Sequence, residues 1–440
     1  MTPRKKILVI TYYWPPAGGP GVQRWLKFVK YLPEFGWEPT VFIPQNASYP
    51  IVDDTLSGEI SADLKILRQP IWEPYHLAEL FGKSNKKFKA GQFDVAENQS
   101  WKSKLSIWVR GNFFIPDARI FWVKPSVRRL KKYLEENNFD AIATTGPPHS
   151  VHLIGLALKK HFPDLPWVAD FRDPWTEISY YQHLKLTQSA DRKHRALEQE
   201  VFKTANVTLA TSYADAENFS AQGAHAVCIT NGFDLNTSQI QNRAAFRSDQ
   251  FTLSYIGVLE QLRNPVILWQ QLEQILHENK DFKKHFVLKF VGRIDDQILA
   301  KLQSGNLGDH IKNKGYLSHA EANQEMKTSE LLLITNFPDE RSKGIIPGKI
   351  FEYLAAGKEI LSFGPAGSDV QKIMEETNAG KHFTHNADAE SLKRYLLEKF
   401  EHWKNGSAEI EKRDIQQYSR RNLTASLAEL LNSLLAENKQ

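Results

Sequence analysis

The sequence predicts an α/β protein that contains two doubly wound parallel sheets in tandem. Short β-rich runs alternate with helix-length amphipathic segments along most of the 440 residues, a pattern typical of parallel strands joined by crossover helices. The alternation forms two series, separated by a polar stretch without hydrophobic periodicity over residues 235–250. The length also fits two or three domains of about 150 residues each.

The first series predicts a sheet in the N-terminal part of the chain. Its apolar runs are bounded by turn residues, as expected of buried strands, and helical periodicity fills the intervals between them. The expected strands are 6–11, 38–43, 141–145, 167–170, 207–211 and 226–229, and the expected helices are 22–35, 124–137 and 149–160. Residues 50–100 lack such a pattern, so we expect an irregular surface insertion there.

The second series repeats this alternation after residue 250. The expected strands are 251–256, 286–291, 311–316, 331–335 and 360–363, and the expected helices are 265–279, 295–302, 348–356 and one that begins at residue 320. A last helical segment, 410–439, has an apolar face of Leu423, Leu427, Leu430, Leu431 and Leu434. The predicted domains are therefore residues 1–234 and 250–405, followed by a C-terminal helix in 410–440.

The composition excludes several classes of protein. Hydrophobic residues make up 41% and charged residues 24%, which fits neither a disordered nor a membrane-embedded chain. A single cysteine, Cys228, excludes an internal disulfide framework and fits a reducing compartment. The apolar run near the N-terminus is too short for a signal peptide, and no run reaches about 18 apolar residues, so we expect a cytoplasmic protein without a membrane span.

Two segments have the composition of ligand-binding sites. The first expected strand leads into the glycine-rich loop YYWPPAGGPG and then a helix, an arrangement in which backbone N–H groups can contact an anion or sugar hydroxyls. It is not a dinucleotide-binding fingerprint, because Arg24 stands where the third glycine should be. A tight turn without a ligand is the alternative interpretation.

The second segment is SKGIIPGKIFEYLAAGK, where Pro347 and Gly348 begin a short helix that Gly357 ends. Its free N–H groups and Lys349 suit a diphosphate, and Glu352, one turn later, could accept hydrogen bonds from a ribose. Alternatively, Glu352 only complements the helix dipole.

Together with TTGPPHSVHLIGLAL, DFRDPW, ITNGFD and SYIGVLEQLRNP, these two segments resemble glycosyltransferase family 4, in the subset associated with bacterial surface polysaccharides, over about residues 5–400. The resemblance implies a GT-B fold: two Rossmann-like domains that face each other across a cleft, with a C-terminal helix that crosses back to the N-terminal domain. It further implies a retaining glycosyltransferase that takes a UDP- or GDP-linked sugar as donor substrate and needs no cofactor and no metal. We find no Asp-x-Asp after a strand and no clustered histidines in the sequence.

The resemblance also assigns the donor site. Arg263 and Lys349 match the cations that contact the donor diphosphate, and Glu352 matches the glutamate that contacts the ribose. The family's preceding glutamate is Gly344 here, so Glu340, Lys343 or backbone groups would face the sugar instead. The donor-binding residues expected on this basis are Gly18, Gly19, Arg263, Gly348, Lys349, Ile350 and Glu352.

On the acceptor side the expected residues are Tyr13, Arg24, Arg172 and Asp173. His149, which follows the Gly146-Pro147-Pro148 turn, would donate a hydrogen bond to the sugar or the leaving phosphate, and Asp173 would orient the acceptor hydroxyl or act as a base. A capping or core role is the alternative for His149. An internal ion pair is the alternative for Asp170 and Arg172. The expected catalytic residues are thus His149, Asp173, Arg263 and Lys349, where fixed cations stabilise the leaving diphosphate.

Basic and aromatic residues gather between residues 83 and 132. Thirteen lysines and arginines stand there against three acidic residues, with Trp101, Trp108, Phe113, Phe114, Phe121 and Trp122 among them. This composition suits peripheral contact with an anionic membrane that presents a lipid-linked acceptor. A solvated charged face is the alternative, and we expect no nucleic acid partner because no nucleic-acid motif accompanies the residues.

The predicted function is therefore transfer of a sugar to a glycan or lipid-linked acceptor in cell-envelope polysaccharide or glycoconjugate synthesis. Two alternatives share the fold: a nucleotide-sugar epimerase or hydrolase, and a non-catalytic partner protein.

Overall fold

The computed structural model describes residues 4–73, 101–178, 181–234, 248–406 and 414–437. The chain forms two compact units. The first domain comprises Met1–Asn231 together with Arg420–Gln440, and the second comprises Gly232–Ser419.

A seven-stranded parallel sheet forms the centre of the first domain, in the order β3-β2-β1-β4-β5-β6-β7. Its strands are β1 (Lys5–Thr11), β2 (Trp37–Pro44), β3 (Lys65–Gln69), β4 (Ala141–Gly146), β5 (Trp167–Phe171), β6 (Val207–Ala210) and β7 (Ala226–Cys228). The helices are α1 (Pro20–Tyr31), α3 (Trp101–Phe113), α4 (Ile120–Glu136), α5 (Ser150–His161), α6 (Gln188–Thr204), α7 (Tyr213–Ala221) and α16 (Arg420–Glu437).

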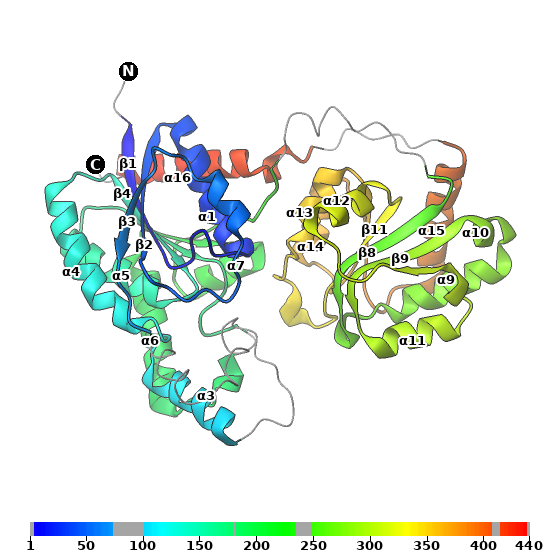
Figure 1. Ribbon diagram of the computed structural model, residues 1–440, viewed down its shortest axis with the longest axis horizontal. Coiled ribbons are helices and arrows are strands. Elements are labelled where there is room, and N and C mark those ends of the chain that lie inside the picture. The colour runs from blue at the N-terminus through cyan, green and yellow to red at the C-terminus, as the bar shows by residue number, and fades with distance from the viewer. Residues whose placement is uncertain (1–3, 74–100, 179–180, 235–247, 407–413, 438–440) are drawn as a thin grey trace. The chain divides into compact units, whose positions relative to one another are not determined.

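Apolar side chains cover both faces of this sheet. Along β1, Ile7 and Val9 belong to one core cluster, and Leu8 and Ile10 belong to another, as the alternation of side chains along a strand requires. The first cluster also contains side chains of α1 and α16, and the second contains side chains of α4, α5 and α6. Helices accordingly flank the sheet on both sides (Figure 1).

The C-terminal helix α16 returns to the first domain, as predicted. Leu427 and Leu431 are fully buried in the cluster that also holds Trp25 of α1. Two polar contacts add to this packing: the Arg420 guanidinium donates to Gln23 Oε1 at 2.8 Å, and Arg421 pairs with Glu34.

A six-stranded parallel sheet in the order β10-β9-β8-β11-β12-β13 forms the centre of the second domain. The strands are β8 (Phe251–Leu259), β9 (Phe286–Ile294), β10 (Ile311–Asn313), β11 (Leu331–Thr335), β12 (Glu359–Phe363) and β13 (Gly380–Phe383). The helices are α9 (Val266–Glu278), α10 (Lys280–His285), α11 (Asp296–Ser304), α12 (His319–Lys327), α13 (Lys349–Ala356), α14 (Asp369–Thr377) and α15 (Ala389–Lys404).

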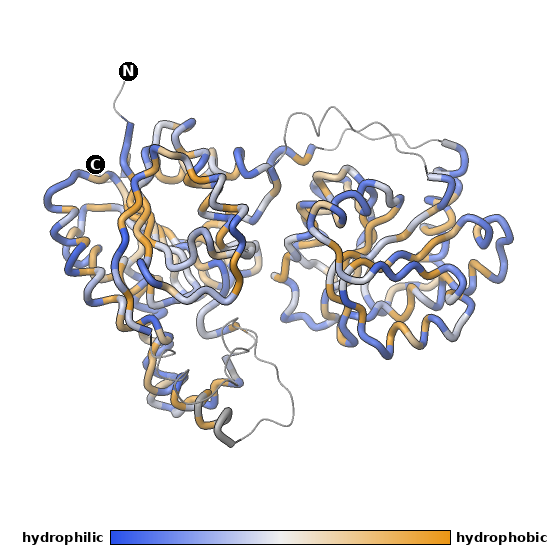
Figure 2. The backbone as a smooth tube through the Cα atoms, in the orientation of Figure 1, coloured by the Kyte–Doolittle hydropathy of each residue, from blue (hydrophilic) through white to orange (hydrophobic). Residues whose placement is uncertain are grey.

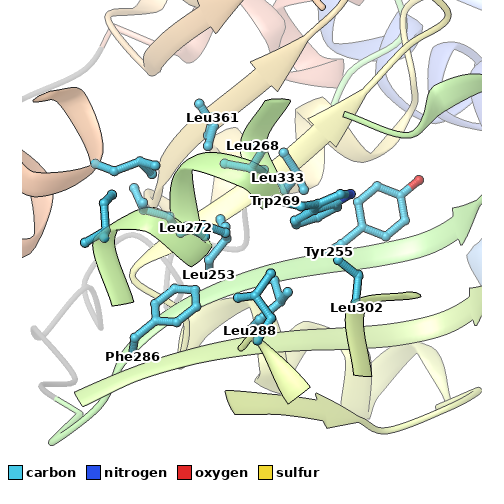
Figure 3. Packing of buried hydrophobic residues seen from close by; sticks show 14 of the residues in the cluster. Leu253, Tyr255, Leu268, Trp269, Leu272, Phe286, Leu288, Leu302, Leu333 and Leu361 are labelled. Atoms are coloured by element: carbon cyan, nitrogen blue, oxygen red, sulfur yellow. The ribbon is translucent and has the colours of Figure 1, made fainter. Parts of the chain in front are cut away.

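The core of the second domain lies between this sheet and helices α9, α11 and α15. Leu272 of α9 lies beside Leu253 of β8, and Leu268 of α9 lies beside Leu333 of β11, all within one core cluster (Figure 3). Hydrophobic residues are concentrated along the strands of both domains, and hydrophilic residues are concentrated on the outer helices (Figure 2).

The structure corrects one expectation about the insertion. Residues 54–59 form a 3₁₀ turn and residues 65–69 form β3, which pairs in parallel with β2, so part of the stretch 50–100 belongs to the sheet. Residues 74–100, with the lysines at 83, 86, 87 and 89, lie outside the described residues. Among the helices that the structure describes, none combines the length and the apolarity that a membrane span needs.

Candidate functional site

Two glycines with positive φ face each other at the carboxyl ends of β8 and β9. Gly257 and Gly292 are paired in register and both have positive φ, +131° and +107°. A Cβ on Gly292 would lie 2.3 Å from the Gly257 carbonyl oxygen, so only glycine fits there. At Gly257, a Cβ would lie 2.5 Å from Lys349 Nζ, so this glycine leaves room for an ammonium group.

Lys349 lies in the first turn of α13 and reaches back to the end of β8. Its Nζ donates to the Ile256 carbonyl at 2.6 Å and lies 4.3 Å from the centroid of the Tyr255 ring. Burial, with a smaller contribution from the nearby Arg263 cation, lowers the pKa of Lys349 to about 8, and Glu352 opposes the shift. The ammonium is therefore desolvated, and a carbonyl and a ring face are its close partners.

Arg263 supplies a second cation from the turn after β8. Its guanidinium lies 4.4 Å from the centroid of Phe337, the second residue after β11. The nearest carboxylate in an ion pair with it is Glu260, at 3.9 Å and itself largely exposed, so this pair is weak. Because Arg263 also depresses the pKa of Lys349, the two cations act on the same small region.

The other predicted residues at and around the start of α13 differ in how accessible they are to a ligand. Gly348 precedes the helix, and a Cβ there would meet no atom within 4 Å. Glu352 is about half exposed, and His319 Nε2 lies 3.5 Å from its Oε1. Ile350 has a fully buried side chain, and its N–H already donates to the Pro347 carbonyl at 3.0 Å, so its predicted contact with the donor stays a prediction.

Asn336, a buried side chain next to the loop that contains Gly344, was not among the residues predicted from the sequence. Asn336, the first residue after β11, is 2% exposed and donates through Nδ2 to the Ile345 carbonyl at 2.7 Å. Its Oδ1 is buried and has no hydrogen-bond partner among the described residues. Lys343 and Glu340, the predicted replacements for the missing glutamate, pair with each other at 2.5 Å. Its position at the carboxyl end of a predicted strand, where open α/β sheets bind ligands, is the feature of the sequence that could have identified Asn336.

In the first domain, the glycine-rich loop is anchored on residues 50–53. Gly18 N donates to the Ile51 carbonyl at 3.0 Å, and Asp53 N donates to the Pro16 carbonyl at 2.8 Å. The Gly18 N–H group therefore already has a hydrogen-bond partner within the protein. Gly19, at φ +104°, precedes α1, and a Cβ there would have open space around it. Of the two predicted glycines, Gly19 is the one whose surroundings leave room for a ligand.

Asp170 and Arg172 do not form the internal ion pair considered above, so that interpretation is wrong. The Asp170 carboxylate pairs with Arg24 at 2.9 Å and also accepts hydrogen bonds from Trp25 Nε1 and Thr145 Oγ1. Arg24 is 3% exposed, and its remaining donors bind the carbonyls of residues 229 and 230. Arg24 therefore holds α1 to the end of β5 from the interior of the domain.

Arg172 instead joins two loops at the carboxyl edge of the sheet. Its Nε donates to the Gly146 carbonyl at 3.0 Å, and its Nη2 donates to the Pro147 carbonyl. A Cβ on Gly21 would lie 1.6 Å from Arg172 Nη1, so the start of α1 also touches the guanidinium. Asp173 follows directly. Asp173 is exposed, yet the surrounding protein partly desolvates its carboxyl group and raises its pKa, an effect that Arg172 opposes.

His149 lies beside these loops at the start of α5. It is 6% exposed, and neither ring nitrogen has a hydrogen-bond partner among the described residues. Burial lowers its pKa well below the usual value, with His152, Arg172 and His194 adding to the effect. His149 is therefore a neutral imidazole at pH 7. Tyr13, the remaining predicted residue, is half-buried and packs edge-on against Tyr12 with ring centroids 4.9 Å apart.

The structure thus gathers the predicted residues into one group in each domain. Lys349, Arg263 and Glu352 interact in the second domain, next to Gly348, and His149 and Asp173 both interact with Arg172 in the first. Within the described ranges, no three His, Cys, Asp or Glu side chains are grouped so that they could hold a metal ion.

Comparison with solved structures identifies the fold. Anabaena HepE, solved in complex with UDP and glucose, aligns with a TM-score of 0.54 at 15% identity, over 98% of this chain and 100% of that one. A glycosyltransferase from Rickettsia africae gives 0.56 at 13% identity, over 98% and 99%. A putative UDP-N-acetylglucosamine 2-epimerase from Listeria monocytogenes gives 0.51 at 12% identity, over 99% and 97%. At these identities the likeness shows the fold, and the predicted GT-B class is confirmed.

Sequence comparison supplies the family. No curated protein matches the chain. The family model for Glycosyltransferase Family 4 matches residues 21–237, which covers the first domain from the start of α1 through β7. Over these residues of its first domain, the chain therefore matches glycosyltransferase family 4, as the sequence motifs predicted.

Proposed function

We propose that the protein is a retaining glycosyltransferase that moves a sugar from a nucleotide-sugar donor to a glycan or lipid-linked acceptor during cell-envelope polysaccharide or glycoconjugate synthesis. The observation that carries this proposal is the pair of cations at the carboxyl edge of the second sheet. Lys349 and Arg263 act on one region, and among the described residues neither has a carboxylate within normal hydrogen-bonding distance. Such a region binds an anion with at least two negative charges, as a sugar diphosphate has.

The donor would be held by its diphosphate. Lys349 and Arg263 bind the phosphate oxygens, the open start of α13 at Gly348 adds backbone N–H groups, and Glu352 accepts from the ribose hydroxyls. Asn336 Oδ1, buried and without a partner among the described residues, is suited to accept a hydrogen bond from the sugar. The relative solved with UDP and glucose makes UDP the first nucleotide to test, and GDP the second.

The chemistry follows from the charge that develops when the glycosidic bond to the diphosphate breaks. Negative charge grows on the leaving oxygen, and fixed cations stabilise it without reorganisation. Arg263 and Lys349 carry this role in the proposal, so neither a metal nor a cofactor is required. His149, neutral at pH 7, donates one hydrogen bond to the sugar or the leaving phosphate, and Asp173 orients the acceptor hydroxyl.

A cytoplasmic protein that uses a lipid-linked acceptor needs contact with the membrane, and one surface of the first domain fits that role. Trp108 and Phe113 of α3 and Phe121 of α4 are exposed, and Phe121 packs edge-on against the exposed Trp72. Exposed basic side chains of α4, Lys124 and Arg128 among them, follow directly in the chain. Aromatic rings beside several cations suit peripheral binding to an anionic bilayer, at about 1 kcal/mol for each basic residue.

Vesicle binding tests this contact. The double variant Lys124→Glu, Arg128→Glu is expected to lose binding to vesicles with anionic lipid, while Lys283→Glu, Lys284→Glu in the second domain, with two equally exposed lysines, keeps it. Equal sedimentation of both variants with the vesicles would contradict the membrane contact.

Turnover tests the proposed reaction itself. Release of nucleoside diphosphate from a panel of nucleotide sugars should depend on an added glycan or lipid-linked sugar, and the product should keep the anomeric configuration of the donor. Arg263→Ala should abolish release, whereas Arg341→Ala, which removes an exposed arginine of the same domain, should not. Release of nucleoside diphosphate without any acceptor, or epimerisation of the free nucleotide sugar, would instead indicate an epimerase or hydrolase, which the fold also allows.

A further inference from the structure

An aromatic and histidine cluster surrounds His149 and is not explained by donor or acceptor binding. We call His149, Trp175, His194 and Glu198 the His149 cluster. Trp175 follows the DFRDPW segment, and its ring lies parallel to that of His149, with centroids 5.1 Å apart and an interplanar angle of 6°. All four side chains are nearly or fully buried.

The stack is the contact that can fix the plane of His149. A buried histidine is normally oriented by a hydrogen bond to one ring nitrogen. Neither nitrogen of His149 has such a partner among the described residues, and its other ring neighbours, Phe171 and His152, are tilted by 36° and 34°. The flat face of Trp175 is thus the only parallel ring against His149 in the described part of the chain.

Trp175 is itself held at two points by helix α6. Its indole Nε1 donates to His194 Nδ1 at 3.1 Å, and its backbone N–H donates to Glu198 Oε1 at 3.2 Å. The same carboxylate accepts from Thr176 N and Thr176 Oγ1, at 3.1 and 2.5 Å. His194 and Glu198 are four residues apart, on one face of α6, so one helix grips both the ring and the backbone of Trp175.

His194 has a defined protonation state in this arrangement. Because Nδ1 accepts from the indole, the ring proton is on Nε2, which lies 3.3 Å from the Gly111 carbonyl of α3 and donates to it. Burial lowers the pKa of His194, which favours the same neutral form. The indole of Trp175 is therefore anchored through His194 to the backbone of α3.

We propose that Trp175 is a positioning residue for His149: the indole, held by His194 and Glu198, fixes the plane of the imidazole so that a ring nitrogen keeps one direction toward the reacting groups. This inference rests on the proposed function, in which His149 donates to the sugar or leaving phosphate. A small misplacement of such a donor lowers the rate of the chemical step by up to about a hundredfold. Trp175 contacts no reacting atom in this account and acts only through His149.

The indole of Trp175 also shields one face of the His149 ring from water, which affects the pKa of His149. The charged and titratable groups that depress the pKa of His149 are His152, Arg172 and His194, but burial is the largest cause. Removal of the indole admits water to one face of the imidazole, so the pKa of His149 should rise toward the ordinary value of about 6.5.

Histidine NMR titration of the full chain tests the proposal, with Trp175→Leu and Trp175→Phe as the two variants. Leucine removes the stack, whereas phenylalanine keeps a flat ring and loses only the bond to His194. We expect the pKa of His149 to rise most in Trp175→Leu and less in Trp175→Phe. Trp72→Leu, the same change at an exposed tryptophan of the same domain, should leave it unchanged.

Kinetics add a second readout that loss of stability alone would not produce. In Trp175→Leu, kcat should fall on the order of ten- to a hundredfold while KM for the donor stays the same, and Trp175→Phe should recover most of the loss. An unchanged His149 titration in a folded Trp175→Leu variant would overturn the proposal. If the wild type turned over no nucleotide sugar at all, the proposed function would fail, and the titration would still decide whether Trp175 controls His149.

Discussion

At the scale of single residues, the most informative side chain is Lys349. A lysine whose ammonium is desolvated normally pairs with a carboxylate. In the part of the chain that the structure describes, the close partners of Lys349 are the Ile256 carbonyl and the face of Tyr255, and Arg263 lies near it. The two neighbouring cations repel each other. A bound anion would reduce this repulsion and would also form favourable interactions with both cations.

This arrangement predicts how donor affinity depends on pH. Burial and Arg263 lower the pKa of Lys349 to about 8, and a bound diphosphate raises it again. The protonated form binds, so affinity is full below pH 8 and falls by up to about tenfold for each pH unit above it. Calorimetric titration of UDP or GDP at pH 7, 8 and 9 measures this fall. Lys349→Arg, which keeps its charge, should flatten the profile; a flat profile in the wild type would argue against Lys349 as a diphosphate ligand.

His152 makes a prediction about stability. It is fully buried, its Nδ1 is hydrogen-bonded to Thr144 Oγ1 at 2.9 Å, and burial lowers its pKa to about 3. Because the unfolded chain takes up a proton near pH 6.5 and the folded chain does not, stability is full above pH 6.5 and falls steadily as the pH drops toward 3. The loss at pH 5 should be about 2 kcal/mol from this residue.

Denaturant unfolding at pH 7 and pH 5 checks that loss in the first domain. His152→Asn, whose Oδ1 can replace Nδ1 as acceptor and which does not titrate, should reduce the difference between the two pH values by about the same 2 kcal/mol. An undiminished pH dependence in this variant would show that other groups are responsible.

At the scale of helices and strands, the sequence predicted central elements well and edge elements poorly. Strands such as β1 and β11 are continuous apolar runs because helices cover both of their faces. The strands that were missed are β3, with sequence KILRQ, and β13, with sequence GKHF, and both lie at the edge of a sheet. Their residues are mostly half-buried or exposed, so no apolar run marks them.

In the candidate site, too, some features could be predicted from the sequence and others could not. Lys349 was predicted as a donor ligand because it stands at a recognisable helix start, and Arg263 because it matches a residue of the family that the sequence resembles. The partner of Asp170 could not be predicted, because Arg24 is 146 positions away, whereas Arg172, the obvious candidate, is separated from Asp170 by Phe171 alone. Asn336 was missed because the unpaired oxygen of a buried amide is a property of packing and leaves no pattern in sequence.

The paired glycines of β8 and β9 predict a difference between two glycine substitutions. Gly292→Ala places a Cβ 2.3 Å from the Gly257 carbonyl, a backbone atom that cannot move alone. Gly367→Ala also adds a Cβ at positive φ, +67°, but meets no atom within 4 Å. Gly367→Ala should therefore cost about 1 kcal/mol, and Gly292→Ala about 1–3 kcal/mol more. Equal losses in denaturant unfolding would contradict the close strand contact.

At the scale of the whole molecule, the second domain is inserted into the first along the chain. The first domain takes residues from both ends, since α16 supplies Leu427 and Leu431 to the same core cluster as β1 and α1. The side chains proposed to bind the donor diphosphate and ribose, Lys349, Arg263 and Glu352, all belong to the second domain. Stability of the first domain and donor affinity of the second should consequently respond to different substitutions.

Leu427→Ala tests that separation. It removes a fully buried side chain from the core of the first domain and should cost 2–5 kcal/mol of its unfolding free energy, roughly as in other buried Leu→Ala changes. Nucleotide affinity, measured by titration at a temperature where the variant is folded, should stay within about twofold of the wild type. A large loss of affinity would show that the donor site depends on α16.

Thermal unfolding with a panel of UDP, GDP, ADP, CMP and their common sugar conjugates tests whether Arg263 and Lys349 form a binding site for a nucleoside diphosphate sugar. One nucleoside diphosphate, present at about a hundred times its dissociation constant, should stabilise the wild type by roughly 2.7 kcal/mol. Arg263→Ala should lose most of that shift, and Arg341→Ala should keep it. If no member of the panel shifted the wild type, or if Arg263→Ala responded as the wild type does, the proposed donor site would be wrong.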